Sequence, residues 1–421
     1  MSKGDAKCKS DPIFVVGSPR SGTSILTWCL GQHANILPQE ESGWLGEFAV
    51  NLGVQYRTGN LHGQRSQLSA LGMDREAFFR TFGDSINAMI LGCRARQERI
   101  SQDCCKNDPS QINPAFALSQ SSDDPKARWV DGTPEYSYYI AGLRKLFPSA
   151  KFVHIVRDVR SVVNSMLNFK MGDGGKLVET EQQAYEYWLG TVEACVQAER
   201  AYGAQVVYRL RYDDLVRNPE QTMRRVLDFL NEPYMEACLQ PLTSRINSSC
   251  VANDFDAHDP RTDIAVINQA LRLSEQLQQT DAHFPVSAGS HAQIEGEFGK
   301  RVAFVAGLDA DYAAGQCKVA TLTNRLNWCG AAIAFNFLMA SAVLAAAWLE
   351  GQRTISHYGI LWFASSCIGV GIYVAIRRAG LQDYAVRLLC KYGFLAHPEH
   401  QGAMKEQAGP VLPHRLDTRK M

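Results

Sequence analysis

The chain has 421 residues, and its 43 Lys and Arg balance its 43 Asp and Glu, so the formal net charge is zero. This balance argues against a nucleic-acid-binding protein, which presents a basic face to its ligand. The 12 cysteines include no C-x-x-C pair and no Cys/His cluster at zinc spacing, so we expect no metal site and interpret the cysteines as reduced core residues of a reducing compartment.

The first ten residues contain no hydrophobic signal segment, so we expect the domain that follows to stay in the compartment where it is synthesised. Residues 12–25, PIFVVGSPRSGTSI, open with an apolar run that predicts a buried strand. A glycine-bounded turn, two hydroxyl residues and a helical run follow. This order presents backbone N–H groups and a helix N-terminus to a phosphate. The candidate anion-binding residues are Ser18, Arg20, Ser21, Gly22, Thr23 and Ser24.

The glycine spacing of this turn matches a Walker P-loop, but Thr23 stands where the nucleotide-binding lysine belongs, which argues against Mg·ATP or Mg·GTP chemistry. The cation inside the turn is Arg20, whose guanidinium suits a pair of phosphate or sulfate oxygens. The motif PRSGT resembles the 5′-phosphosulfate loop of the sulfotransferases, and most closely their tyrosylprotein and bacterial branches. The donor of that family is 3′-phosphoadenosine 5′-phosphosulfate (PAPS). The alternative is a turn that only joins a strand to a helix.

Two adjacent glutamates, Glu40 and Glu41, lie 20 and 21 positions after Arg20. Tyrosylprotein sulfotransferases place a catalytic glutamate in a paired-Glu segment at about this distance, so the resemblance implies that Glu41, or else Glu40, is the catalytic base and that Arg20 assists. Sulfuryl transfer needs a base, because the acceptor hydroxyl loses its proton as its oxygen attacks sulfur. The alternative is a pair of solvated glutamates at a helix start.

Residues 45–120 are less informative: apolar spacing predicts one amphipathic helix over 78–90, and we expect acceptor specificity to lie in this stretch. The segment WVDGTPE follows, in which Gly132 stands where many sulfotransferases have the lysine of W-x-x-K-T-P. The resemblance implies that this lysine lies near the bridging oxygen of the donor. A charge that stabilises the leaving phosphate is therefore missing or comes from elsewhere, with Arg128 and Lys106 as weak candidates.

The second strong block, 147–166, predicts a buried strand over 152–156 and a helix that starts at Asp158. Arg157 follows the strand directly, at the edge where ligands of open α/β sheets bind. Ser165 comes eight residues later. The pair resembles the sulfotransferase motif that holds the 3′-phosphate of PAPS, although the spacing alone does not establish that both side chains reach one anion. A structural salt bridge of Arg157 is the alternative, and we interpret His154 as a satisfied core histidine.

A long amphipathic helix is predicted over 182–202, followed by a buried strand over 206–215. The string VVYRLRYDDLVRNPE resembles the R-Y-E-D-L block of sulfotransferases, where it is architectural. We therefore expect Arg211 to form a salt bridge with Asp213 or Asp214 rather than to contact the nucleotide.

Two uncharged runs near the C-terminus, 328–349 and 358–376, are long enough to cross a membrane as helices. At ~1.5 Å per residue they measure roughly 33 and 28 Å, against a hydrocarbon core of about 30 Å. Lys and Arg residues flank their outer ends, so the positive-inside rule places both ends and the preceding domain in the cytosol. A pair of buried helices in a soluble domain is the alternative.

These patterns predict an α/β fold: a three-layer P-loop-like domain with a central parallel sheet over 1–316, a two-helix transmembrane hairpin within 317–378, and a cytosolic tail over 379–421 that is partly amphipathic and then disordered. The resemblance covers roughly 12–235. It implies a membrane-anchored, metal-independent sulfotransferase that moves a sulfuryl group from PAPS to a hydroxyl of a lipid, glycan or peptide. The alternatives are a P-loop small-molecule kinase and a non-catalytic membrane protein that binds 3′-phosphoadenosine 5′-phosphate (PAP).

Overall fold

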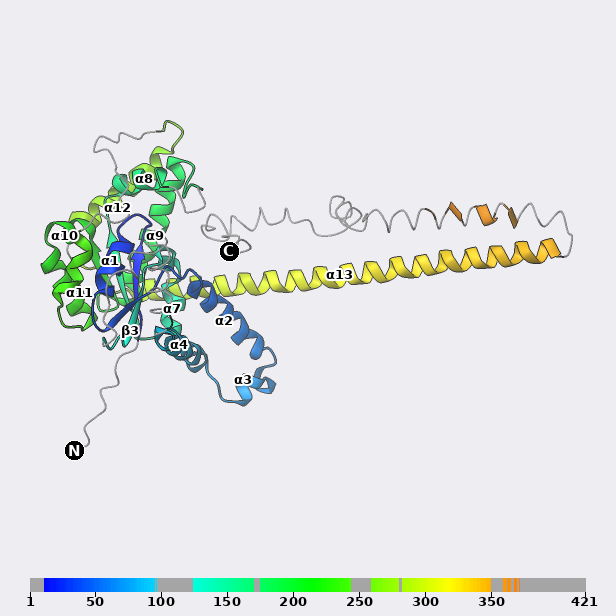
Figure 1. Ribbon diagram of the computed structural model, residues 1–421, viewed down its shortest axis with the longest axis horizontal. Coiled ribbons are helices and arrows are strands. Elements are labelled where there is room, and N and C mark those ends of the chain that lie inside the picture. The colour runs from blue at the N-terminus through cyan, green and yellow to red at the C-terminus, as the bar shows by residue number, and fades with distance from the viewer. Residues whose placement is uncertain are drawn as a thin grey trace. The chain divides into compact units, whose positions relative to one another are not determined.

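A computed structural model of the protein describes residues 11–94, 96, 124–169, 175–243, 259–279, 282–349, 359–360, 362–364, 367–368 and 371 (Figure 1). The chain divides into two units, residues 1–305 and 306–421. The first unit contains the sheet and the residues predicted to bind the donor.

The first unit is built around a five-stranded sheet in which every strand pair is parallel. In spatial order the strands are β2 (Ile36–Pro38), β3 (Arg128–Asp131), β1 (Ile13–Gly17), β4 (Lys151–Val156) and β5 (Val207–Arg211). β1 lies at the centre and is fully buried, as its run of apolar residues predicts. The α/β fold with a central parallel sheet is therefore confirmed.

Helices cover both faces of the sheet, because the strands are apolar on both sides. Odd-numbered residues of β1, such as Ile13 and Val15, join one core cluster with α1 and α11. The opposite face carries an aromatic cluster in which Phe14 stacks on Phe152 with ring centroids 5.3 Å apart. The helices are α1 (Thr23–Gly31), α2 (Leu45–Gly59), α3 (Gln67–Ala70), α4 (Arg75–Gly92), α7 (Ile140–Leu146), α8 (Val159–Leu167), α9 (Glu181–Tyr202), α10 (Tyr212–Arg217), α11 (Pro219–Leu230), α12 (Ile264–Gln279) and α13 (Ala288–Leu349), with 3₁₀ turns η1 (Gly63–Arg65), η3 (Pro134–Tyr139) and η4 (Glu236–Thr243).

Several predicted elements are confirmed with shifted ends. The helix expected over 78–90 is α4, and the one expected over 182–202 is α9, which begins with a capping box between Thr180 and Gln183. The strand expected over 206–215 is too long, because β5 ends at Arg211 and α10 follows at once. Two aspartates in the first turn of α10 favour a helix N-terminus over a buried strand.

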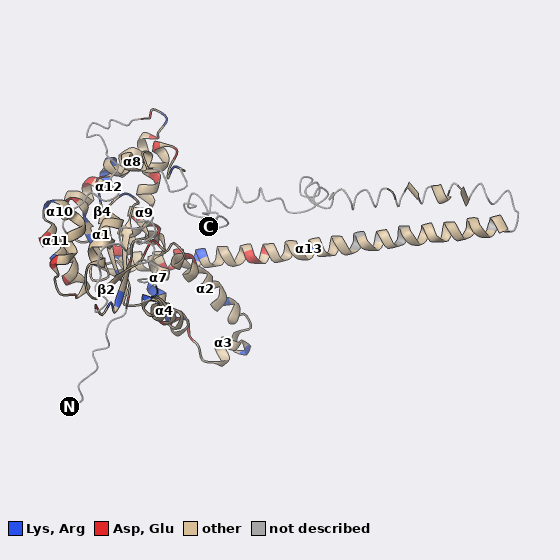
Figure 2. Ribbon diagram, viewed as in Figure 1, with Lys and Arg blue, Asp and Glu red and all other residues tan. Residues whose placement is uncertain are grey.

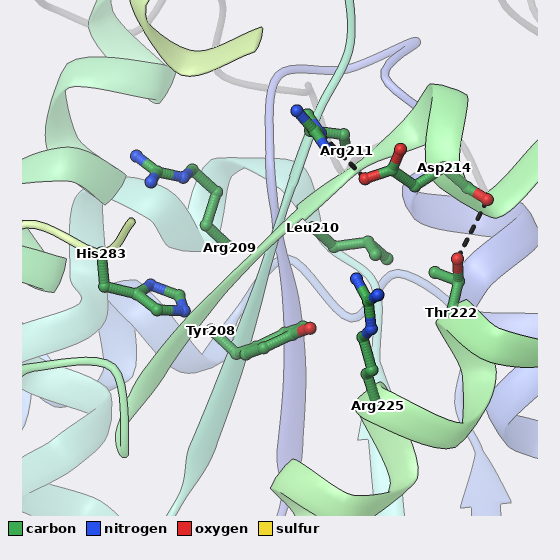
Figure 3. A pocket seen from close by; sticks show the side chains of 8 residues that line it. All are labelled: Tyr208, Arg209, Leu210, Arg211, Asp214, Thr222, Arg225 and His283. Atoms are coloured by element: carbon green, nitrogen blue, oxygen red, sulfur yellow. Dashed lines mark hydrogen bonds and ion pairs between the residues drawn. The ribbon is translucent and has the colours of Figure 1, made fainter. Parts of the chain in front are cut away.

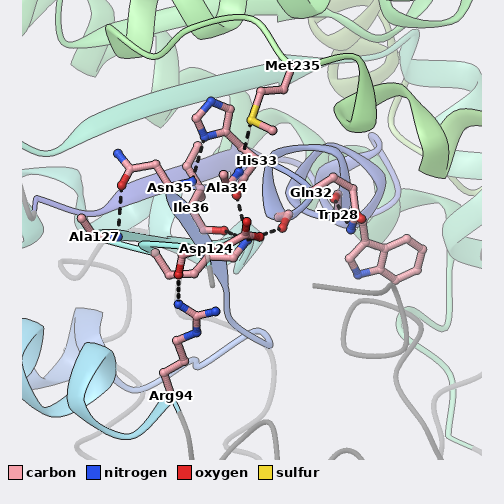
Figure 4. Close-up of polar contacts among 12 residues, drawn as sticks. Trp28, Gln32, His33, Ala34, Asn35, Ile36, Arg94, Asp124, Ala127 and Met235 are labelled. Carbon is pink, nitrogen blue, oxygen red and sulfur yellow. Dashed lines mark hydrogen bonds and ion pairs between the residues drawn. The ribbon is translucent and has the colours of Figure 1, made fainter. Parts of the chain in front are cut away.

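A buried lysine joins the end of α1 to β2. The Nζ of Lys126 donates hydrogen bonds to the carbonyl oxygens of Gly31, His33 and Ile36 at 3.1, 2.7 and 3.0 Å. Its side chain is fully buried, and Asp124 lies 3.7 Å away. Burial lowers the pKa of Lys126 to about 8. The polar contacts around His33, Ile36 and Asp124 are drawn in Figure 4. An ammonium group here satisfies carbonyls that α1 leaves open at its C-terminus.

Replacing Lys126 with Met is expected to lower the free energy of unfolding by about 2–4 kcal/mol, because three buried carbonyl oxygens lose their donor. Urea denaturation followed by circular dichroism measures this loss. Lys176→Met is the matched control, since the Lys176 side chain is half exposed. Equal stability of the two variants would contradict a structural role for Lys126.

The second unit contains most of α13, which includes all of the first uncharged run, 328–349. That run is therefore helical, as predicted. Most of the second run, 358–376, and the predicted tail 379–421 lie outside the described residues. Within the described part of the chain, no helix is long and apolar enough to cross a membrane, so the transmembrane hairpin is not confirmed.

Candidate active site

The loop between β1 and α1 follows a path that ordinary side chains rarely allow. Gly17, Arg20 and Gly22 have positive φ values of 143°, 67° and 106°. A Cβ on Gly17 would lie 2.5 Å from the carbonyl oxygen of Ile155, and one on Gly22 would lie 2.6 Å from the Tyr212 ring. Both positions require glycine, because the loop fits tightly against Ile155 and Tyr212. No side chain caps the N-terminus of α1, so its N–H groups face the loop.

Arg20 and the predicted 3′-phosphate residues lie together. The Nε of Arg20 donates a hydrogen bond of 3.1 Å to the Oγ of Ser165, and the Nη1 of Arg157 donates one of 3.3 Å to the carbonyl oxygen of Arg20. Burial and the nearby charge of Arg157 lower the pKa of Arg20. The parallel sheet explains this arrangement, since β1 and β4 are neighbours and their carboxyl ends lie at one edge.

Tyr212, at the start of α10, belongs to the same edge. The guanidinium of Arg157 lies 4.7 Å from the centre of the Tyr212 ring, and that ring also packs against Gly22. The sequence resemblance predicts an architectural role for the block around Tyr212 and does not predict this contact. Its position directly after β5, which pairs with β4, was the available signal.

Glu41 interacts electrostatically with Arg20. Partial loss of hydration, together with the negative charges of Glu135 and Asp131, raises the pKa of Glu41 to about 7, although Arg20 and a hydrogen bond from Ser24 oppose the rise. A carboxylate with such a pKa can accept a proton near neutral pH. Glu40 and Glu41 are both exposed, so exposure does not distinguish them, and it is the electrostatic interaction with Arg20 that connects Glu41 to the loop between β1 and α1.

Hydrogen bonds attach the segment that carries Glu41 to η3. The backbone N–H of Gly43 donates to the Oγ1 of Thr133 at 3.3 Å, and that of Leu45 donates to the Oη of Tyr136 at 3.0 Å. Ser42 and Tyr136 also share a hydrogen bond between their hydroxyls. These contacts hold Glu41 at the carboxyl edge of the sheet, near the loop between β1 and α1.

The sequence profile of the Sulfotransferase family matches residues 12–236. The chain belongs to the sulfotransferase family. It is 25% identical over 227 residues to protein-tyrosine sulfotransferase A of Caenorhabditis elegans, covering 54% of this chain and 51% of the relative. It is 26% identical over 231 residues to protein-tyrosine sulfotransferase 1 of Danio rerio, covering 54% and 55%. The chain thus spans about half the length of the curated relatives it matches.

Among solved structures, the sulfotransferase domain of the Synechococcus PCC 7002 olefin synthase aligns with 71% of this chain and 98% of its own length, at 20% identity and a TM-score of 0.34. The sulfotransferase domain of the curacin biosynthetic pathway aligns with 69% and 97%, at 19% identity and a TM-score of 0.33.

In this member of the family, position 132 has no room for the lysine of W-x-x-K-T-P. A Cβ on Gly132 would collide with the Oγ1 of Thr27, which itself donates a hydrogen bond to the carbonyl oxygen of Thr23. Arg128 cannot replace the lysine, because its guanidinium binds the carbonyl oxygens of Asp11 and Leu230 near the amino end of β3. Lys106 lies outside the described residues.

His154 lies in the core of this sulfotransferase, as predicted, but it is not satisfied. Both ring nitrogens lack a hydrogen-bond partner among the described residues, and burial lowers the pKa of His154 to about 3. It therefore stays neutral and away from the chemistry. The salt bridge predicted for Arg211 is confirmed: its Nε donates to the Oδ2 of Asp214 at 2.8 Å.

A cavity of about 100 Å³ lies along the edge strand β5 (Figure 3). Its lining residues are Tyr208, Arg209, Leu210, Arg211, Asp214, Thr222, Arg225 and His283. None of the residues predicted to bind the donor or to act as base lines it, so this cavity is separate from the site around Arg20.

Proposed function

We propose that this protein binds PAPS and transfers its sulfuryl group to an acceptor hydroxyl. The observation that supports this most directly is the position of Arg20, which bonds Ser165, lies beside Arg157 and interacts electrostatically with Glu41. The two anion-binding motifs are thus close enough to hold the two ends of one nucleotide. Membership of the sulfotransferase family supports the same chemistry.

The residues present fit such a donor. The loop amides, the N-terminus of α1 and the side chains of Arg20, Thr23 and Ser24 would hold the 5′-phosphosulfate. Arg157 and Ser165 would hold the 3′-phosphate. The Oγ of Ser21 is buried without a hydrogen-bond partner among the described residues, which fits a loop that turns polar groups toward an anion.

Bound PAPS supplies an activated sulfuryl group whose leaving group is a phosphate. Glu41 accepts the proton of the acceptor hydroxyl as its oxygen forms the new bond to sulfur and the bond from sulfur to the phosphate oxygen breaks. Arg20 faces the charge that develops on that phosphate. Because Gly132 contributes no cation, Arg20 carries this electrostatic role among the described residues, while Arg157 holds the 3′-phosphate.

PAP is expected to raise the melting temperature of the purified protein, and ADP at the same concentration is expected to raise it much less, because Arg157 and Ser165 bind the 3′-phosphate that ADP lacks. At a PAP concentration about 100 times its Kd, binding stabilises the fold by about 2.7 kcal/mol. Thermal denaturation measures the shift. Arg157→Ala should abolish the difference between the ligands. Equal stabilisation by PAP and ADP would favour the kinase alternative.

Transfer of labelled sulfate from PAPS to a hydroxyl acceptor separates the enzyme from a protein that only binds PAP. The first acceptors to test are tyrosine peptides, since the relatives are named protein-tyrosine sulfotransferases. Tight PAP binding without transfer to any peptide, glycan or lipid tested would favour the non-catalytic alternative.

Membrane attachment through 328–376 also remains a proposal, supported by the two uncharged runs. The full chain is expected to sediment with membranes and to resist extraction with alkaline carbonate, whereas a chain ending at residue 316 should remain in the supernatant. Equal partitioning of the two forms would contradict the anchor.

A further inference from the structure

Acidic side chains gather where an acceptor must approach Glu41. The hydrogen bonds from Gly43 and Leu45 to η3 bring Glu41 close to Glu135, the second residue of η3. The Oη of Tyr187, on α9, donates a hydrogen bond to the Oε1 of Glu135 and so fixes this carboxylate. Since Glu135 is only half-buried, it remains accessible to an acceptor.

Two described cations, Arg20 and Arg301, lie near these carboxylates. Arg20 lies in the loop between β1 and α1 and contacts Ser165. Arg301 donates a hydrogen bond of 3.0 Å to the carbonyl oxygen of Tyr138, and its guanidinium lies 4.6 Å from the centre of the Tyr139 ring. Neither contact of Arg301 neutralises its charge, but the two carboxylates of Glu41 and Glu135 outnumber it once Arg20 is directed to a polyanionic donor, so the acceptor side keeps a negative potential.

An aromatic cluster follows Glu41 along the chain and extends to α4. Trp44, three residues after Glu41, precedes α2 and is 42% exposed. Its ring centroid lies 5.6 Å from that of Phe48, which lies 6.2 Å from that of Phe82, itself 37% exposed. Aromatic faces beside carboxylates attract cations and disfavour anions.

We propose that the site selects its acceptor by charge, so that a cationic hydroxyl compound is preferred to a neutral one and a neutral one to an anionic one. This selectivity rests on the proposed sulfuryl transfer. Glu135 acts as the selecting residue, since its carboxylate lies beside Glu41 and Tyr187 holds it there. Glu135 is also a positioning residue for the base, because its charge opposes ionisation of Glu41.

The test uses three acceptors with the same phenol: tyramine, which is cationic, N-acetyltyrosinamide, which is neutral, and N-acetyltyrosine, which is anionic. The kcat/KM for sulfate transfer from PAPS should fall in this order, by about tenfold from first to last at low salt. Added salt should reduce the ratio. Calorimetry on the PAP-loaded protein should give the same order for acceptor binding without any need for transfer.

Glu135→Gln should reduce the ratio of kcat/KM for tyramine to kcat/KM for N-acetyltyrosine. It should also shift the rising part of the pH–rate profile to lower pH, since Glu41 loses a negative neighbour. Tyr187→Phe removes the hydrogen bond to Glu135 but leaves the Glu135 carboxylate in place, so it should reduce the ratio less. Glu220→Gln, on the surface of α11, is the matched control and should change neither.

An equal or reversed charge order with active enzyme would overturn the selectivity and leave the proposed function standing. An unchanged ratio in Glu135→Gln would remove Glu135 from the role. If PAP binds but none of the three phenols is sulfated and calorimetry shows no charge order, both the transfer to phenols and the selectivity are refuted.

Discussion

Replacing Glu41 with Gln is expected to lower the rate of sulfuryl transfer by about 10²–10⁴-fold, because the amide cannot take the proton of the acceptor hydroxyl. The fold and the donor contacts should remain, since Glu41 is exposed and is not among the residues proposed to hold the donor. Steady-state kinetics with labelled PAPS measure the loss, and the thermal shift with PAP confirms that the nucleotide still binds.

The pH dependence provides an independent check on the same residue. The base must be deprotonated to act, so kcat/KM of the wild-type protein should rise with pH and level off above the Glu41 pKa of about 7. The Glu41→Gln variant should lose this rise of kcat/KM with pH. Glu40→Gln is the matched control: that exposed neighbour should keep both the rate and the profile. If Glu40→Gln proves the more damaging change, the base has been misassigned.

The sequence predicts the centre of this fold well because its strongest signals are local. β1 is a continuous apolar run and β4 is apolar apart from Lys151 and His154, as parallel strands buried on both faces require. The loop between β1 and α1 has glycines at two of its three positive φ values. Once the two strands pair, Arg20 and Arg157 must lie at one edge of the sheet. The eight-residue spacing left open whether Arg157 and Ser165 reach one anion. The hydrogen bond from Arg20 to Ser165 brings Ser165 to the loop that Arg157 also contacts, and the shared anion stays a prediction.

Other features depend on contacts between distant segments and leave no local signal. Lys126 caps carbonyls about 90 residues away, and Tyr187 bonds Glu135 across 52 positions. The sequence shows that Gly132 departs from the family pattern. Only the structure shows that Thr27 occupies the space that a side chain at position 132 would need. The predicted end of β5 was wrong because of a misleading local signal: the apolar residues up to Leu215 concealed the start of α10 at Tyr212.

Replacing Arg20 with Ala should reduce kcat/KM for transfer by about 10³-fold, equivalent to about 4 kcal/mol, since one guanidinium serves both the donor and the developing charge on the leaving phosphate. No lysine at position 132 can compensate. Stabilisation by PAP should also fall, because the link between the loop and Ser165 is lost. Removal of a positive neighbour should raise the pKa of Glu41, so the residual activity should rise with pH at a higher midpoint than in the wild type.

Arg20→Lys separates charge from geometry in this prediction. Both side chains share the left-handed backbone at position 20, so backbone strain is similar, but the ammonium cannot bond two oxygens in a plane. We therefore expect the lysine variant to restore the pH midpoint, which depends on charge, and to recover only part of the rate, which depends on bidentate contacts. Ser165→Ala, which removes the hydroxyl alone, should weaken PAP binding without moving the midpoint. Full activity of Arg20→Ala would place the essential cation outside the described residues and refute the role given to the loop.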